Sequence, residues 1–305
     1  MKSRRVFRVA LILLSILVVD VCDAAELERS VSPSGQFVIY GGTAAWRGAI
    51  STLAEQTKSD LLAILQRRDQ WATPAVINLQ PRAANLPEMP NAELRFSQTG
   101  AGLKLQLDLA ISREINSAAV EHEIMRLILL EIIYRNQTGI PPGETYVAPP
   151  DWLIDGLLAL APNRNRSSLV EALAASERTP TLEEFLRERF ELLDSAGRSL
   201  YRAYSFALVK LLAESPARLG RYIDNLARAS DDSLAELQKD FPQLAGTDFE
   251  KTWRSKVGSV KESRRSDLLT FWLWANSQQH LTEHSCPAFS RTPTAPKLLD
   301  RKSVV

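Results

Sequence analysis

The order of apolar and polar positions divides the chain into a strand-rich first part and a helical second part. Residues 37–42, FVIYGG, form a short β-rich run that two glycines stop, and residues 43–66 follow with apolar side chains at helical spacing. Three further runs predict strands, namely PAVINLQ at 74–80, AELRFSQ at 92–98 and the strictly alternating GLKLQLDLA at 102–110. The separator TGAG between the last two predicts a β-hairpin. We therefore expect a small α/β subdomain over residues 25–112.

Beyond this region the apolar spacing is almost entirely helical, and Ser, Thr, Asp and Pro stand where helices would begin. The expected helices are near residues 116–135, 151–160, 167–176, 181–194, 198–213, 217–229, 232–239 and 247–257. They make up a helical subdomain over residues 113–258. A C-terminal helix is expected within 259–286, and a disordered tail rich in Pro, Thr and Lys over 287–305. The predicted fold class is α+β, with a small mixed sheet-and-helix part followed by a mostly helical half.

The first residues have the pattern of a signal peptide. A basic start, MKSRR, precedes an apolar stretch that is too short to span a bilayer comfortably. The small residues Cys22 and Ala24 follow, and they predict cleavage between Ala24 and Ala25. Lipidation at Cys22 is disfavoured because Val21 stands where a small residue is expected. We therefore expect an exported protein, periplasmic or secreted, with residues 1–24 removed and no stable membrane span afterwards.

Composition and net charge indicate a globular protein and argue against some classes of binding partner. The chain has 305 residues, of which 45% are hydrophobic and 24% charged, which is typical of a globular protein with a sizeable core. Its formal net charge of +1 argues against a nucleic-acid partner, because such binders show a marked basic excess. After removal of the signal, Cys286 is the only thiol, so no internal disulfide is expected.

Residues 120–131, VEHEIMRLILLE, nearly spell a zinc-peptidase motif. In H-E-x-x-H the two histidines share one helix face and bind one ion, and the glutamate between them is the general base toward a metal-bound water. Here His122 and Glu123 begin the string, but Arg126 stands in place of the second histidine. A guanidinium has no lone pair to donate and stays protonated, so Arg126 cannot be a metal ligand.

A second string, PPDWLIDGLLAL at residues 149–160, places a carboxylate on a helix that follows a proline-rich loop. Together the two strings resemble the gluzincin metallopeptidases of the MA clan. In that family an H-E-x-x-H helix is followed by a P-x-W-L-x-E-G helix, whose glutamate is the third zinc ligand. The matching positions here are Pro150, Trp152, Leu153 and Gly156, whereas Asp155 takes the place of the glutamate. The resemblance covers roughly residues 37–257.

The resemblance implies a gluzincin-like fold whose zinc site is degenerate. One imidazole and one shortened carboxylate are too few protein ligands for a catalytic zinc, which needs three. His122, Glu123, Arg126 and Asp155 are therefore interpreted as vestigial positions, with no catalytic residue, metal or other cofactor expected.

Two roles remain open for Arg126. Its guanidinium would take the place of the ion by pairing with Asp155, and with Glu123 on its own helix, or it would point into solvent. His122 and Trp152 are each interpreted as structural residues, a hydrogen-bonded histidine and a core anchor, and Gly156 as a position that permits close helix packing.

Other candidate sites carry less weight. His280, His284 and Cys286 have spacing suited to a metal, but they border the expected disordered tail. The aromatic run FWLWAN at residues 271–276 is expected to dock on its own domain. P-loop, dinucleotide and G-x-S-x-G motifs are absent from the sequence.

The expected function is that of an exported, non-catalytic pseudopeptidase that binds a peptide or an envelope protein in the cleft of the old enzyme. Two alternatives stay open. One is an active zinc metallopeptidase with altered ligands, in which His122 and Asp155 hold the ion and Glu123 is the base. The other is a purely structural envelope protein.

Overall fold

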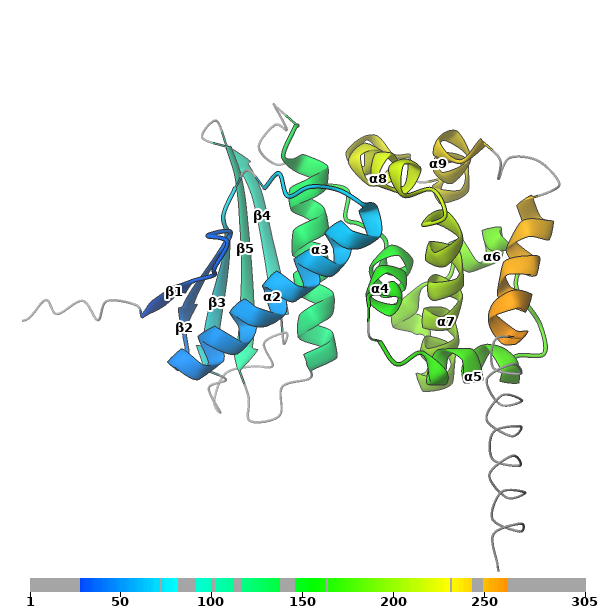
Figure 1. The fold of residues 1–305 in the computed structure, drawn as a ribbon, viewed down its shortest axis with the longest axis horizontal. Coiled ribbons are helices and arrows are strands. Elements are labelled where there is room, and N and C mark those ends of the chain that lie inside the picture. The colour runs from blue at the N-terminus through cyan, green and yellow to red at the C-terminus, as the bar shows by residue number, and fades with distance from the viewer. Residues whose placement is uncertain are drawn as a thin grey trace, which may run out of the picture.

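The computed structural model describes residues 28–71, 73–81, 92–99, 102–111, 117–137, 146–162, 164–230, 232–242 and 249–262. A five-stranded sheet occupies one side and a group of helices the other (Figure 1). This arrangement confirms the predicted α+β class. The expected signal peptide, the run 271–276, the cluster His280, His284 and Cys286, and the tail 287–305 all lie outside the described residues.

The sheet has the strand order β1-β2-β3-β5-β4. Its strands are β1 (Arg29–Val31), β2 (Phe37–Gly41), β3 (Ala75–Pro81), β4 (Ala92–Thr99) and β5 (Gly102–Ile111). The central strands β2, β3 and β5 are parallel, whereas the edge strands β1 and β4 are antiparallel to their neighbours. The β4–β5 pairing runs to Thr99 opposite Gly102, which confirms the predicted hairpin pairing. Strand β1 was not predicted, because three residues are too few for an alternation to be recognised.

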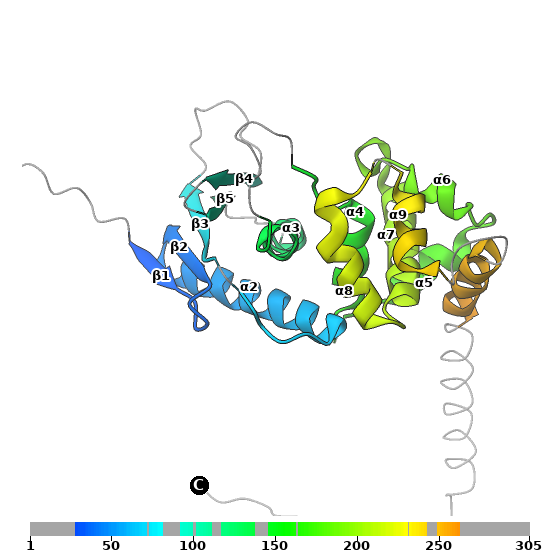
Figure 2. The ribbon, with the colours of Figure 1, turned by 90° about the horizontal axis from the view of Figure 1, so that it is seen from above.

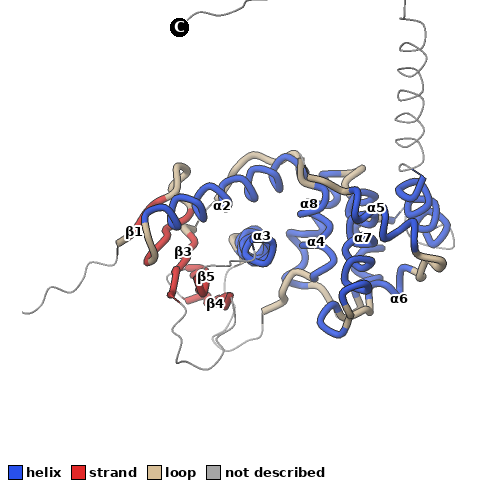
Figure 3. Tube along the Cα trace, turned by 90° about the horizontal axis from the view of Figure 1, so that it is seen from below, coloured by secondary structure: helices blue, strands red, loops and turns tan. Residues whose placement is uncertain are grey.

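One face of the sheet is apolar and lies under two helices, α2 (Ala44–Leu65) and α3 (Ser117–Tyr134). Every second residue of the strands points to this face, so Phe37, Ile39, Ile77 and Leu107 are fully buried. Figures 2 and 3 show α2 and α3 on the same side of the sheet, with α3 between the sheet and the remaining helices. This central position explains the burial of α3: from residue 124 to 134 every residue except Arg126 is buried.

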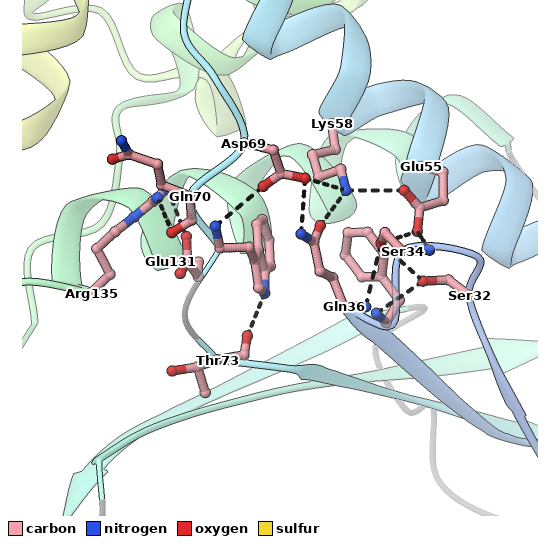
Figure 4. Close-up of polar contacts among 12 residues, drawn as sticks. Ser32, Ser34, Gln36, Glu55, Lys58, Asp69, Gln70, Thr73, Glu131 and Arg135 are labelled. Carbon is pink, nitrogen blue, oxygen red and sulfur yellow. Dashed lines mark hydrogen bonds and ion pairs between the residues drawn. The ribbon is translucent and has the colours of Figure 1, made fainter.

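A polar network fixes α2 to the start of β2 (Figure 4). The Lys58 ammonium, on a side chain only 6% exposed, lies 3.0 Å from Oδ2 of Asp69 and 3.0 Å from Oε2 of Glu55, and it also donates to Gln36. Hydrogen bonds to its partners lower the pKa of the Asp69 carboxyl, although burial opposes that shift. The three donors of the buried ammonium are thus matched by three acceptors, as a buried charge requires.

The helical half follows the predicted order. It contains α4 (Asp151–Leu160), α5 (Ser167–Ala175), α6 (Leu182–Leu186), η1 (Phe190–Leu192), α7 (Ser195–Leu212), α8 (Pro216–Asn225), η2 (Leu226–Arg228) and α9 (Ser233–Asp240). Residues 249–262 are also helical. The single helix predicted over 181–194 is wrong, because the chain forms two short pieces there. Asp194 instead caps α7 by accepting a hydrogen bond from the Gly197 N–H at 2.7 Å, so α7 begins earlier than predicted.

Helix α4 packs closely against α7 through Gly156. A Cβ atom built on Gly156 would lie 2.3 Å from Cγ2 of Val209 and 2.5 Å from the carbonyl oxygen of Ser205. The expectation that this glycine permits close helix packing is therefore confirmed. Trp152 is 2% exposed and lies 6.1 Å from the ring of Tyr222, which confirms it as a core residue.

Candidate functional site

The residues of both sequence strings meet where the first turns of α3 and α4 approach each other. His122, Glu123 and Arg126 come from α3, and Asp155 comes from α4. Asp151, the first residue of α4, joins them. The predicted site residues are therefore brought together in space. The predicted pair of Arg126 with Glu123 is confirmed, whereas its partner on α4 differs from the prediction.

Arg126 connects the two helices. Its Nη1 donates to both carboxylate oxygens of Glu123 at 2.8 Å, and its Nη2 donates to Oδ1 of Asp151 at 2.9 Å. The solvent-pointing alternative is wrong, since the Arg126 side chain is 27% exposed and has two carboxylate partners.

The predicted ion pair between Arg126 and Asp155 is also wrong in its partner. The Nε2 atom of His122 lies between the two α4 carboxylates, 3.9 Å from Oδ1 of Asp155 and 4.0 Å from Oδ1 of Asp151, whereas Arg126 reaches Asp151. Side chains four residues apart share a helix face, so Arg126 lies one turn beyond His122 on α3 and Asp151 lies one turn before Asp155 on α4. At this position Arg126 meets Asp151 instead of Asp155.

Asp155 is buried, with 6% of the residue exposed. Its Oδ1 lies 3.5 Å from Nε of Arg202, and its Oδ2 makes no hydrogen bond with the described residues. Burial raises the pKa of the Asp155 carboxyl, and the nearby charges of His122 and Arg202 oppose that rise. Arg202 comes from α7 and was not predicted. Arg202 belongs to no recognised sequence motif. It lies near Asp155 only because α7 packs on α4.

The geometry does not fit a zinc ion. A catalytic zinc takes three protein ligands at roughly 2.0–2.2 Å. Two of the nearby carboxylates, those of Glu123 and Asp151, are already bound by the Arg126 guanidinium, whose positive charge opposes a dication between them. Within the described residues, no group of three or more His, Cys, Asp or Glu side chains is placed to hold a metal ion.

A cavity of about 590 Å³ opens beside Arg126. Its walls come from the start of β4, the α3 residues Glu123 and Arg126, the segment leading into α4, and Glu191 of η1. Strand β4 lies at the edge of the sheet, with β5 as its one neighbour among the described strands. No backbone hydrogen bond joins its other side to any described residue. The cavity therefore adjoins a strand edge whose outward N–H and C=O groups form no backbone hydrogen bond within the described part of the chain.

Aromatic side chains hold the segment before α4 against this edge. The ring of Tyr146 lies 4.7 Å from that of Phe96 on β4, and Phe96 lies 4.7 Å from Tyr134 on α3. The hydroxyl of Tyr134 accepts a hydrogen bond from the Val147 N–H at 2.8 Å. These contacts fix one wall of the cavity relative to β4 and α3.

No helix among the described residues is long and apolar enough to cross a bilayer. No protein-family model matches the chain, and no curated protein matches it either.

Proposed function

We propose that the chain is an exported, non-catalytic pseudopeptidase of gluzincin-like architecture that binds an extended peptide of an envelope partner. The position of Arg126 is the observation that supports the absence of catalysis in this proposal. Its guanidinium is bonded to Glu123, the residue that the resemblance assigns as general base, and to Asp151 across the helix junction. A carboxylate held in two such bonds is poorly placed to take a proton from water.

Peptide binding is supported by the cavity and by the strand edge beside it. An extended peptide can add to an open edge strand through main-chain hydrogen bonds and place alternate side chains in neighbouring pockets. Among the described strands β4 offers such an edge, and the cavity of about 590 Å³ lies at its first residues. Neither feature needs a metal.

The observation that favours the zinc-peptidase alternative is the approach of His122 to Asp155, at 3.9 Å between Nε2 and Oδ1. Metal analysis separates the two functions. We expect the purified chain, incubated with zinc and dialysed, to retain far less than one zinc per chain and to leave an unstructured casein substrate uncut. One firmly held zinc, lost on His122→Ala, together with cleavage of casein, would establish the alternative.

A matched pair of variants tests whether Arg126 is what prevents metal binding. Arg126→His with Asp155→Glu restores the ligand types of the resembled motif and should gain zinc. Arg126→Met with Asp155→Glu removes the guanidinium without adding a ligand and should not. If both variants bind zinc equally, the charge of Arg126 and not the missing imidazole is the obstacle.

Hydrogen–deuterium exchange tests peptide binding. The probes are acetylated, amidated heptapeptides Thr-Val-Thr-X-Thr-Val-Thr, in which X is Arg, Lys, Gln or Glu, because β-branched residues favour an extended chain. A bound peptide should slow exchange in β4 and in the first turns of α3, and should leave α9 unchanged. Absence of protection in β4 with all four peptides would leave the purely structural alternative.

A further inference from the structure

A second cavity, of about 300 Å³, lies at the C-terminal end of α3. Its walls come from the end of α2 and the segment that follows it, from the end of α3, and from α8, and it shares no lining residue with the cavity at Arg126. Three of its lining residues are arginines, Arg67, Arg68 and Arg135, and one is an acid, Asp224. The charged groups that line it are therefore mostly positive.

Arg67 is held in one position by two contacts. Its Nη1 and Nη2 donate to the two carboxylate oxygens of Asp224 at 2.9 and 2.6 Å. Its guanidinium also lies against the backbone of α8 at Gly220, where an added Cβ would lie 2.6 Å from Cζ, Nε and Nη2 of Arg67. A guanidinium has five N–H groups, so a bidentate pair with one carboxylate leaves other donors unused. Arg67 is thus fixed in place and keeps donors for a ligand.

Arg135 is fixed by a buried acid (Figure 4). Its Nη2 lies 2.8 Å from Oε2 of Glu131, whose side chain is fully buried, and its Nη1 donates to the carbonyl oxygen of Gln70 at 2.8 Å. Among the hydrogen bonds of the described residues, none joins the guanidinium of Arg67 or Arg135 to the last carbonyl groups of its own helix. Capping of α2 and α3 therefore does not account for these two cations.

Arg68 is the third arginine of the cavity, and it makes no hydrogen bond or ion pair with the described residues. Its neighbour in sequence, Asp69, is bonded instead to Lys58 and Gln36 (Figure 4). Asn136, exposed like Arg68, also lines the cavity and has an amide that can donate. Like charges repel, so a third cation beside two others is unfavourable unless an anion joins them. The arrangement favours the binding of an anion.

The number of donors and the charge distinguish between kinds of anion. A carboxylate has one charge and two oxygens, whereas a phosphate group carries about −1.5 to −2 at pH 7 and has three strong acceptor oxygens. Three guanidinium groups match the phosphate better. The cavity volume lies at the lower end of the range for ligand pockets, about 300–1,000 Å³, and so suits a small group.

From this geometry we infer that the cavity binds a phosphate group through Arg67, Arg68 and Arg135, either as free phosphate or as the headgroup of a lipid. Arg67 and Arg135 are held ready by Asp224 and Glu131, and Arg68 supplies the charge that no described carboxylate offsets. The inference is independent of the proposed peptide binding, because the two cavities have no lining residue in common.

Isothermal titration calorimetry with inorganic phosphate, at an ionic strength held constant with sodium chloride, tests the inference. We expect saturable binding of one phosphate per chain, and binding of acetate that is at least about tenfold weaker. Sedimentation with vesicles tests the lipid source. The vesicles are phosphatidylcholine alone, or phosphatidylcholine mixed equally with phosphatidic acid, whose headgroup is a phosphate monoester. Sedimentation with the mixed vesicles only, reversed by inorganic phosphate, would identify a lipid headgroup, and phosphate binding without sedimentation would identify free phosphate.

Variants test the named residues. Arg68→Gln removes a cation without a described partner, so the chain should fold normally and bind phosphate about tenfold more weakly, as expected for one lost charge-assisted hydrogen bond. Arg29→Gln is the matched control, an exposed arginine of the edge strand β1 that lines no part of this cavity, and it should leave phosphate binding unchanged. Gly220→Ala keeps every charge but displaces the Arg67 guanidinium, and it too should weaken phosphate binding.

Several results would overturn the inference. Binding of neither inorganic phosphate nor the mixed vesicles would show that the cavity is no phosphate site. Equal affinity for acetate and phosphate would remove the assignment to phosphate. Equal losses in Arg68→Gln and Arg29→Gln would mean attraction to the whole positive surface, and unchanged affinity in Arg68→Gln or Gly220→Ala would mean that phosphate binds elsewhere. None of these results bears on peptide binding at β4.

Discussion

Gly156 allows the packing of α4 on α7 to be tested by adding one methyl group. In Gly156→Ala the new carbon would lie 2.3 Å from Cγ2 of Val209 and 2.5 Å from the Ser205 carbonyl oxygen. Carbon atoms normally approach to about 3.5–4.0 Å, so the helices must separate by more than an ångström. We put the overpacking cost at about 3 kcal/mol, near the top of its usual range, because one clashing atom belongs to the backbone of α7.

Part of this cost is offset, since alanine favours a helix over glycine by about 1 kcal/mol. The net expectation is a loss of about 2 kcal/mol in the free energy of unfolding, measured by urea denaturation with far-UV circular dichroism. Gly48→Ala in α2 is the matched control. A Cβ at Gly48 meets no atom within 4 Å, so the same substitution should there stabilise the protein by up to about 1 kcal/mol.

The opposite signs of the two effects make the reasoning refutable. If Gly156→Ala is as stable as the unmodified chain, or more stable, then α4 and α7 do not pack at the separation described. If both substitutions destabilise, helix propensity does not explain the difference between the two positions.

Three further predictions concern charged groups. Arg126→Met and Asp151→Asn should show a coupling energy of about 1 kcal/mol in a double-mutant cycle of urea denaturation, and additive effects would mean that the ion pair does not form in solution. Because burial raises the pKa of Asp155 above its ordinary 3.8, ionisation of this carboxyl costs the folded state stability as the pH rises through that region. The stability of Asp155→Asn relative to the unmodified chain should therefore be greater at about pH 7 than at about pH 3, and the opposite trend would contradict the direction of the pKa shift. Lys58→Met should cost about 2 kcal/mol, since it leaves two carboxylates facing each other without their cation, and a neutral effect in thermal denaturation would count against the network of Figure 4.

Local pattern was sufficient to predict most elements of the fold. The leucines of β5 alternate because one face of that strand lies on the core, and α4 begins after Pro150 because a proline is tolerated just before a helix but not within it. The break between α6 and η1 was missed because the segment 181–194 keeps helical spacing. No helix extends through this segment to residue 194, because Asp194 is instead the N-cap of α7.

Of the site, the sequence predicted only which residues share one face of a helix. Spacing along α3 placed His122 and Arg126 on one face, and the second string placed Asp155 on α4. The partner of Arg126 depended on the relative direction of α3 and α4, which no local pattern encodes. Arg202 depended on the packing of a third helix, for the same reason.

Between residues 120 and 134 of α3, the three positions that are not buried are His122, Glu123 and Arg126. Every other side chain in that stretch is committed to the interior, where a change of shape is costly. Substitutions at these three positions therefore change the groups that α3 presents outside the core without altering how the helix packs. A helix built in this way separates the residues that fix the fold from those free to vary.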